Sequence, residues 1–425
     1  MLRGFDKEGT MKLIRALAGL VSIALLAASG AALAQQPLKI GFGMSLTGPL
    51  AGNGKAALIS MEIWRDDVNA RGGILGRKVE FVHYDDQTNP ATVPSIYAKL
   101  LDVDKVDLIV SGYGTNVIAP TMPIAMQRKL LLMGLFGLNV NSKFKYDRYF
   151  QIMPAGPDPA IGWSQGFFDA AMGMNPKPKT IAIVGADAEY PAMALEGARA
   201  HAKKTGLKIV YDKTYPPKTV DYAPIVRAIQ ATNPDLVFVA SYPPDSAGMV
   251  RAANEVGLKT RMFGGGLVGP QFAALKTQLG PLLNGVVNYE FYVPELGQQF
   301  PSLQVFLAKY QGRAAKEGVD PLGFYLPPYA YAMMQVLEQA IAKVGSLDQA
   351  KLAAYIHKAE FETFVGKVRF AQNGEWAQSR VLMTQYGGIV GNDVDQFKQG
   401  GKVTVLAPKE YRTGGVKAPY HENKK

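Results

Sequence analysis

The sequence predicts an α/β protein made of two similar lobes, each built on a parallel β-sheet with helices on both faces. Short apolar runs alternate with amphipathic segments from residue 38 onward, and the same alternation starts again near residue 180. Alternation of strands and helices is typical of parallel sheets, because each helix returns the chain to the end of the sheet where the next strand begins. Two such units in one chain of 425 residues indicate two lobes of ordinary domain size.

The first unit is predicted from its hydrophobic pattern. In the helix expected at 54–70, apolar residues recur every three or four positions from Ala57 to Val68. Gly72 directly after it is a helix stop signal. The predicted elements are strands at 38–43, 78–84 and 106–111 and helices at 54–70 and 92–101.

The second unit repeats this order. Gly206 and Gly257 stand just past two amphipathic segments, in the position where glycine commonly ends a helix. The predicted elements are strands at 180–185, 207–211, 235–240 and 261–264 and helices at 192–204, 222–231 and 246–256.

Three segments are candidates for connections between the lobes. Residues 150–159 are rich in proline and glycine, residues 285–292 are extended, and a strand at 365–370 follows helices at 306–316, 326–344 and 349–359. If those helices return to the first lobe, three crossings form a hinge. The expected division is lobe 1 at 35–154, lobe 2 at 155–286, a return to lobe 1 at 287–364, and the third crossing with the end of lobe 2 at 365–425.

The N-terminus resembles a secretory signal peptide. Lys12 and Arg15 precede an apolar stretch at 16–28, and Ala32 and Ala34 form an A-x-A site that would be cut before Gln35. Residues 1–34 are therefore expected to be removed, whether translation starts at Met1 or Met11. The chain has no cysteine for disulfides or lipid attachment. A freely soluble periplasmic protein, not a lipoprotein, is expected.

Charge and motifs argue against several function classes. The net charge is +11, but the lysines and arginines are scattered, so a nucleic-acid partner is not expected. The sequence contains no G-x-S-x-G, H-E-x-x-H or P-loop motif, and Leu46 stands where a dinucleotide fingerprint after Gly41 requires its third glycine. No catalytic residue, metal ligand or cofactor is therefore predicted.

Polar and aromatic residues gather where the predicted strands end. In open α/β sheets, ligands bind beyond the carboxyl ends of strands, beside helix N-termini. Hydroxyls, glycines and aromatic rings at these ends can hold a small polar ligand without supplying a nucleophile and base. The segments are 45–48, 111–115, 133–137, 187–190, 241–242 and 264–268.

Several stretches resemble the branched-chain amino acid binding proteins of ABC importers, which are type I periplasmic binding proteins. They include 48–51 (GPLA), 69–77 (NARGGILGR) and 85–90 (DDQTNP), and the resemblance extends over the whole mature chain. It implies two Rossmann-like lobes with parallel sheets and a three-strand hinge, closing on a solute. It also implies an inner-membrane ABC permease as partner; a monomer is expected.

The resemblance also implies site residues. Residues 111–115 would hold a ligand carboxylate through hydroxyls and helix N–H groups, and aromatics from both lobes would enclose the ligand. The candidate residues are Ser111, Gly112, Tyr113, Thr115, Phe136, Gly137 and Leu138 in lobe 1, Tyr190, Tyr242, Gly266 and Leu267 in lobe 2, and Asn53 and Phe324.

Two positions depart from the family pattern. Gly266 stands where amino acid binders carry a glutamate for the ligand ammonium group, and Asn53 replaces an aromatic, or instead caps the following helix. A buried ammonium without a counter-charge costs several kcal/mol, unless Asp187, Glu189 or Asp245 reaches it. A carboxylate or amide ligand without an ammonium group, such as an aromatic or aliphatic acid, is therefore favoured. The alternative function is a ligand-sensing module of a membrane receptor.

Overall fold

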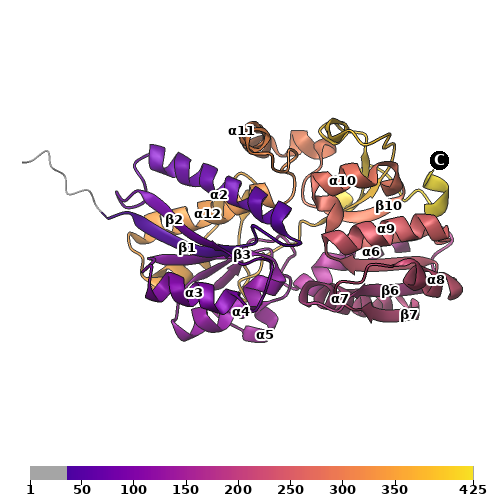
Figure 1. The fold of residues 1–425 in the computed structure, drawn as a ribbon, viewed down its shortest axis with the longest axis horizontal. Helices are drawn as coiled ribbons and strands as arrows, with labels where there is room; N and C mark the ends of the chain where they lie inside the picture. Colours follow the sequence, from indigo (N-terminus) through magenta and orange to yellow (C-terminus); the bar gives the residue numbers. More distant parts are fainter. Residues whose placement is uncertain (1–35, 425) are drawn as a thin grey trace, which may run out of the picture.

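Two separate β-sheets organise the chain, one in each of two lobes that lie side by side (Figure 1). The computed structural model describes residues 36–424, so the predicted signal peptide at 1–34 lies outside the described residues. The sheet of lobe 1 is fully parallel, with strand order β2-β1-β3-β4-β5. Its strands are β1 (Leu38–Met44), β2 (Val79–Asp85), β3 (Leu108–Tyr113), β4 (Leu132–Leu135) and β5 (Tyr149–Gln151).

Helices cover both faces of this sheet. α2 (Ala51–Ala70) packs against α12 (Leu326–Val344), which returns from much later in the chain (Figure 1). The buried Trp64 of α2 links the two helices, because its indole N–H donates a hydrogen bond to Glu338 of α12 at 2.9 Å. The other helices of this lobe are α3 (Val93–Asp102), α4 (Thr115–Gln127), α5 (Asn141–Phe144), α11 (Pro301–Glu317) and α13 (Gln349–Ile356).

The sheet of lobe 2 has the order β14-β13-β10-β9-β8-β6-β7. The five strands β6 to β10 are parallel, whereas β13 pairs antiparallel with both β10 and β14. The sequence-based expectation of parallel sheets missed these two strands, because no helix separates them as in a parallel unit. The strands are β6 (Thr180–Ala186), β7 (Lys208–Tyr215), β8 (Leu236–Ser241), β9 (Met262–Leu267), β10 (Val286–Glu290), β13 (Leu382–Tyr386) and β14 (Val403–Ala407).

Two helices of lobe 2 end directly before the glycines that predicted their ends. Gly206 and Gly257 have φ values of 74° and 67°, in the left-handed region that closes a helix without strain only for residues such as glycine. The helices are α6 (Pro159–Met172), α7 (Glu189–Thr205), α8 (Ala223–Ala231), α9 (Pro243–Val256) and α10 (Ala273–Leu279).

Three segments connect the two sheets: one between β5 and α6, one between β10 and α11, and a third between β12 and β13. The first and third run together, since Arg380 N–H donates to the Pro154 carbonyl at 2.8 Å and Ala155 pairs with Ser379. The strand predicted at 365–370 is present as β12 (Gly366–Val368). It pairs with β11 (Phe361–Thr363) in a small hairpin apart from the two large sheets.

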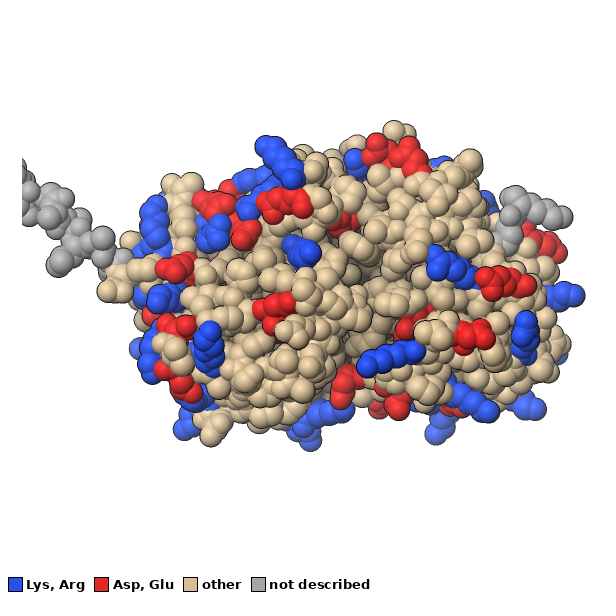
Figure 2. Space-filling model, viewed as in Figure 1, with Lys and Arg blue, Asp and Glu red and all other residues tan. Residues whose placement is uncertain are grey.

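The surface carries charges of both signs. Figure 2 shows lysines and arginines interspersed with acidic residues over this face of both lobes, without a large patch of one sign. None of the helices within residues 36–424 is long and apolar enough to cross a membrane.

Candidate functional site

The two lobes enclose a small cavity at the carboxyl ends of their central strands. Its volume is about 20 Å³, which is room for a water molecule. No charged side chain is among the residues that line it, and half of them are aromatic. The lining residues are Leu50, Tyr113, Gly114, Thr115, Phe136, Leu138, Met153, Trp163, Tyr190, Tyr242, Val268 and Tyr325.

The lobe 1 wall contains the start of helix α4. Gly114 precedes the helix with a φ of 101°, which turns the chain sharply from β3 into α4. The Gly114 carbonyl accepts the N–H groups of Val117 and Ile118, whereas the first amides of a helix have no acceptor within it. The Thr115 hydroxyl oxygen accepts the Leu138 N–H at 3.0 Å, and its own O–H can still donate. This helix start is suited to a carboxylate.

A second feature of the lobe 1 wall is the strained backbone at Phe136. Its φ of 63° lies in the left-handed region, which a bulky side chain rarely adopts outside functional sites. Gln151 stabilises the bend by accepting the Phe136 N–H at 2.9 Å. The bend places the Phe136 ring against Tyr325 and Phe291, with centroids 5.1 and 5.0 Å away.

Tyrosine hydroxyls form a chain along the cavity. Tyr113 and Tyr325 share a hydrogen bond of 3.1 Å, and Tyr289 donates to Tyr325 at 3.5 Å. Burial raises the pKa of all three phenols well above its ordinary value. They are therefore neutral at physiological pH. The Tyr289 proton is engaged with Tyr325, and the Tyr113–Tyr325 pair leaves one hydroxyl proton free to donate to an anion.

The lobe 2 wall is aromatic and offers fewer donors. Tyr190 donates to the Gly266 carbonyl at 2.8 Å, so its hydroxyl proton is already engaged. The Tyr242 hydroxyl is buried and has no hydrogen-bond partner among the residues that the structure describes. α9 begins with Pro243 and Pro244, which lack N–H groups, so this helix start is a poorer anion site than α4.

The wall holds no acid for a ligand ammonium group. A Cβ added at Gly266 would lie 3.0 Å from the Val239 carbonyl oxygen and 3.2 Å from the Tyr190 hydroxyl, so a larger side chain has little space there. Glu189 instead lies 3.6 Å from Lys143 of lobe 1. Asp245 accepts the Tyr222 hydroxyl at 2.9 Å, and Asp187 is exposed. None of these three acids lines the cavity.

The structure brings six of the predicted residues together around the cavity: Tyr113, Thr115, Phe136, Leu138, Tyr190 and Tyr242. Three others are engaged elsewhere. The Ser111 hydroxyl donates to the Gly112 carbonyl at 2.7 Å, Asn288 holds the Leu267 backbone, and Phe324 packs on Tyr292 with centroids 5.2 Å apart. Gly112, Gly137 and Gly266 lie behind the wall and do not line it.

Asn53 does not cap a helix. α2 begins at Ala51 rather than Gly54, so Asn53 lies inside its first turn, buried and outside the cavity lining. Sequence reasoning also missed Trp163 and Tyr325. Trp163 lies in the first turns of α6, directly after the first crossing, and Tyr325 follows Phe324. For Trp163, proximity to the first crossing was the signal in the sequence; for Tyr325, it was the position directly before α12 and next to the predicted Phe324. The other missed lining residues are Leu50 and Met153, whereas Gly114 and Val268 lie within the predicted segments 111–115 and 264–268.

Comparison with known proteins identifies the family. A model of the family described as periplasmic binding protein matches residues 37–388. A leucine-, isoleucine-, valine-, threonine- and alanine-binding protein of Pseudomonas aeruginosa is 24% identical over 375 residues, covering 87% of this chain and 94% of that protein. The Leu/Ile/Val-binding protein of Escherichia coli is 23% identical over 380 residues, covering 84% and 92%.

Solved structures share the fold. A leucine-binding protein of Thermotoga maritima superposes with a TM-score of 0.71 at 20% identity, covering 87% of this chain and 98% of that one. A solute-binding protein of Rhodopseudomonas palustris in complex with p-hydroxybenzoic acid gives a TM-score of 0.72 at 19% identity, covering 88% and 98%. With these matches, the two-lobed chain belongs to the periplasmic binding proteins of type I, in the class of the branched-chain amino acid binders, and is a binding protein rather than an enzyme.

Proposed function

We propose that this protein captures a small organic acid with an aromatic body and delivers it to an ABC permease of the inner membrane. The observation that carries the proposal is the uncharged cavity, which combines neutral hydroxyl donors with aromatic rings in edge-to-face and tilted contact. Such a wall can pair with a carboxylate, whereas the ammonium group of an amino acid would be buried without a counter-charge.

In this proposal, the ligand carboxylate lies at the start of α4. The Thr115 hydroxyl and the first helix amides donate to it, and the positive end of the helix dipole favours its charge. The Tyr242 hydroxyl, which has no partner among the described residues, supplies a donor from lobe 2. The ring of the ligand packs between Phe136 and Trp163, because both line the cavity and both belong to the aromatic cluster around Phe291.

Lobe movement is part of the proposal. A cavity of about 20 Å³ is far smaller than a benzoate-sized molecule, so the lobes or the lining side chains must move to admit it. Three crossings joining the two lobes provide the hinge. The boundary expected between residues 286 and 287 falls inside β10 of the lobe 2 sheet, so the second crossing begins after Glu290. The boundary expected between residues 364 and 365 falls inside the β11–β12 hairpin, so the third crossing begins after Val368. The ligand stabilises the closed form only through contacts that the open form lacks.

Relatives are known for both ligand classes, aromatic acids and amino acids. Two further solute-binding proteins of Rhodopseudomonas palustris were solved with benzoate and with 4-hydroxybenzoate, at TM-scores of 0.70 and 0.69 and identities of 18% and 20%. The curated relatives named above bind aliphatic amino acids. The acid-free cavity wall favours the first group for this chain.

Secretion belongs to the same proposal. We expect cleavage before Gln35 and a monomeric, lipid-free product in the periplasm. N-terminal sequencing of protein recovered from the periplasm checks this, and a product that begins at residue 1 or 11 contradicts it.

A thermal-shift screen tests the ligand class. The protein is unfolded and refolded to remove carried-over ligand, then heated with benzoate, 4-hydroxybenzoate, benzamide, leucine and phenylalanine. A ligand at 100 times its dissociation constant adds about 2.7 kcal/mol to the free energy of unfolding. Stabilisation by the benzoates and not by leucine supports the proposal. Stabilisation by leucine alone contradicts it, because an acid must then reach the ammonium group.

A further inference from the structure

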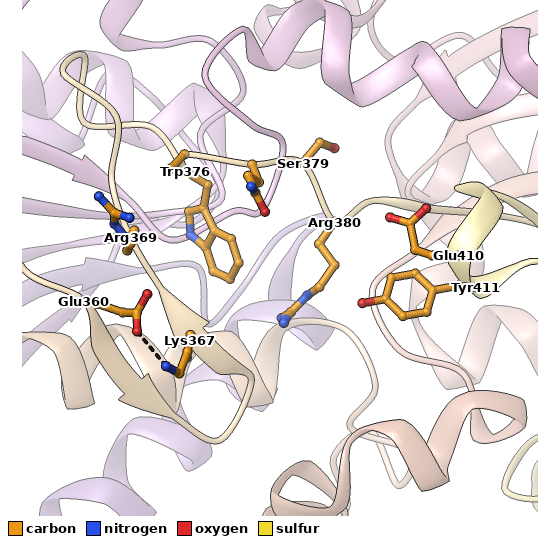
Figure 3. A pocket seen from close by; sticks show the side chains of 10 residues that line it. Glu360, Lys367, Arg369, Trp376, Ser379, Arg380, Glu410 and Tyr411 are labelled. Carbon is orange, nitrogen blue, oxygen red and sulfur yellow. Dashed lines mark ion pairs between the residues drawn. The ribbon is translucent and has the colours of Figure 1, made fainter.

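A second, much larger cavity lies beside the third crossing, which we define as residues 369–381. Its volume is about 510 Å³, within the usual range of small-molecule sites. One wall is formed by Lys367 of the hairpin, the floor by Trp376 and Arg380 of the crossing, and the opposite wall by Glu410 and Tyr411 (Figure 3). An occupant would therefore touch segments that belong to both lobes.

Positive charge in this cavity exceeds what its acids neutralise. Lys367 is paired with Glu360 at 2.8 Å and lies 3.6 Å from Glu362, which does not line the cavity. Arg369 is exposed, and neither Arg369 nor Arg380 forms an ion pair with any residue between 36 and 424. Glu410 on the far wall also has no ion-pair partner within that range. Two guanidinium groups thus face the cavity against one free carboxylate.

Arg380 is held rigidly although it lacks an acid. Its Nη2 donates to the Tyr329 hydroxyl at 3.1 Å and its Nη1 donates to the Val365 carbonyl, while its Nε is buried without a partner among the described residues. The guanidinium lies over the rings of Trp376 and Phe300, 5.1 and 5.5 Å from their centroids. A preorganised guanidinium loses little conformational entropy when it binds an anion.

Trp376 supplies the apolar part of the cavity. Its side chain is 4% exposed, and its indole N–H is buried without a hydrogen-bond partner within the described chain. Figure 3 shows the indole between Arg369 and Arg380, with Ser379 beside it. Because a buried donor without an acceptor costs free energy, a ligand oxygen that reaches this N–H is favoured.

We propose that this cavity is a second binding site, for an organic anion with a flat apolar body. The acidic group pairs with Arg369 and lies in the positive field of Arg380, and the body packs on Trp376 and Tyr411. The site is independent of the proposed function of the cleft. It differs from the cleft in size, in its charged walls and in its position beside the third crossing, and the two cavities share no lining residue.

A fluorescent aromatic sulfonate, 1-anilinonaphthalene-8-sulfonate, is a suitable probe because it is anionic, flat and larger than the cleft cavity. We expect Arg369→Gln to weaken its binding about 10-fold in a fluorescence titration, since charge-assisted contacts are among the stronger ones. The matched control is Arg227→Gln on α8, an exposed arginine without an ion pair in the described residues, which removes the same charge elsewhere. It should bind as the unaltered protein does.

Two more variants locate the probe. Arg369→Lys keeps the charge and should retain most of the affinity. Thr115→Asp alters only the cleft and should leave probe binding unchanged. The proposal is overturned if Arg369→Gln and Arg227→Gln bind the probe equally well, or if Thr115→Asp abolishes binding, because the probe then occupies the surface at large or the cleft. Thermal melting of each variant shows that it is folded.

Discussion

The cleft and the third crossing differ in the charge of their buried polar groups and in how these groups are paired. In the cleft the groups are neutral, and several tyrosine hydroxyls bond to one another or to the backbone, as Tyr113 does to Tyr325 and Tyr190 to Gly266. The Tyr242 hydroxyl and the Trp163 N–H are the lining groups without a partner among the described residues. In the crossing, the Glu375 carboxylate, the Trp376 N–H and the Arg380 Nε are buried without partners among residues 36–424. Satisfied networks rigidify a site, whereas unsatisfied groups destabilise the arrangement that buries them. The cleft is therefore preorganised for binding. In the crossing, by contrast, a rearrangement that gives the buried charged groups partners would lower the free energy most.

The substitution expected to weaken binding in the cleft most is one that places a carboxylate at the start of α4. Thr115→Asp can still accept the Leu138 N–H, so we expect a folded protein. A ligand carboxylate would then face a second negative charge, which costs several kcal/mol. Binding of the ligand found by the thermal-shift screen should weaken at least 100-fold, about 2.7 kcal/mol, by calorimetry.

The control places the same charge at the other helix start. Pro244 is exposed in the first turn of α9, so Pro244→Asp adds a carboxylate to lobe 2 without blocking α4. Its effect on affinity should stay within about threefold. Equal losses in the two variants would place the ligand carboxylate between the lobes rather than on α4.

The variant Glu375→Gln tests the cost of an unpartnered buried group in the third crossing. Burial raises the pKa of the Glu375 carboxyl well above its ordinary value, so the folded state retains a proton that the unfolded state releases. The contribution of this carboxyl to stability is complete below the ordinary glutamate pKa and is lost as the pH rises toward the folded-state pKa, by about 1.4 kcal/mol per pH unit. Relative to the unaltered protein, the Gln variant should gain stability between pH 5 and pH 7.

Urea unfolding at pH 5 and pH 7 measures the free energy of unfolding of both proteins. Subtracting the value for the unaltered protein from that for the variant cancels the contribution of the other titrating groups. Glu410→Gln, which removes an exposed carboxylate next to the crossing, is the control and should show no such gain. A Glu375→Gln variant that tracks the unaltered protein at both pH values would falsify the claim that this acid is buried without a partner.

Two tyrosines of lobe 2 separate binding from packing. Tyr242→Phe removes a hydroxyl that has no partner among the described residues, so it should weaken ligand binding about fivefold, roughly 1 kcal/mol, with unchanged stability. Tyr190→Phe removes the hydrogen bond to the Gly266 carbonyl, so it should cost about 1 kcal/mol of stability. Calorimetry and thermal melting of both variants check the contrast. If both lose affinity alike, the two hydroxyls act together on the ligand.

Periodicity was sufficient to predict the doubly wound elements, because parallel strands and their helices have distinct hydrophobic patterns. It was insufficient for side-chain direction. Ser111 and Tyr113 were both predicted because they lie at the end of the same strand, yet only Tyr113 lines the cavity. A register error of one residue put Phe324 in the site in place of Tyr325. The left-handed backbone of Phe136 could not be foreseen either, since no local preference favours it and tertiary packing imposes it.

The resemblance to the family predicted site residues that hydrophobic periodicity could not predict. It was least informative where this chain departs from the family. Gly266 was identified as a lost acid, and the structure shows that the Tyr190 hydroxyl occupies the space beside it. Trp163 had no motif of its own. It reaches the cavity because α6 starts directly after the first crossing, and only the three-dimensional path of that crossing determines where its first turns lie.

The smallest expected effect concerns the rim, where the lobes meet outside the cleft. Lys143 of α5 and Glu189 of α7 face each other at 3.6 Å, and their side chains are 58% and 49% exposed. Exposed pairs contribute little and are screened by salt. If the pair forms only when the lobes close, Lys143→Gln should weaken ligand binding about twofold at low ionic strength and not at all in 1 M salt. Calorimetry at both salt concentrations tests this, with Lys145→Gln on the same lobe as the control. An equal loss in both variants would indicate general attraction of an anionic ligand to a basic surface, and the contact between the lobes would then add nothing to the selectivity that the cleft already provides.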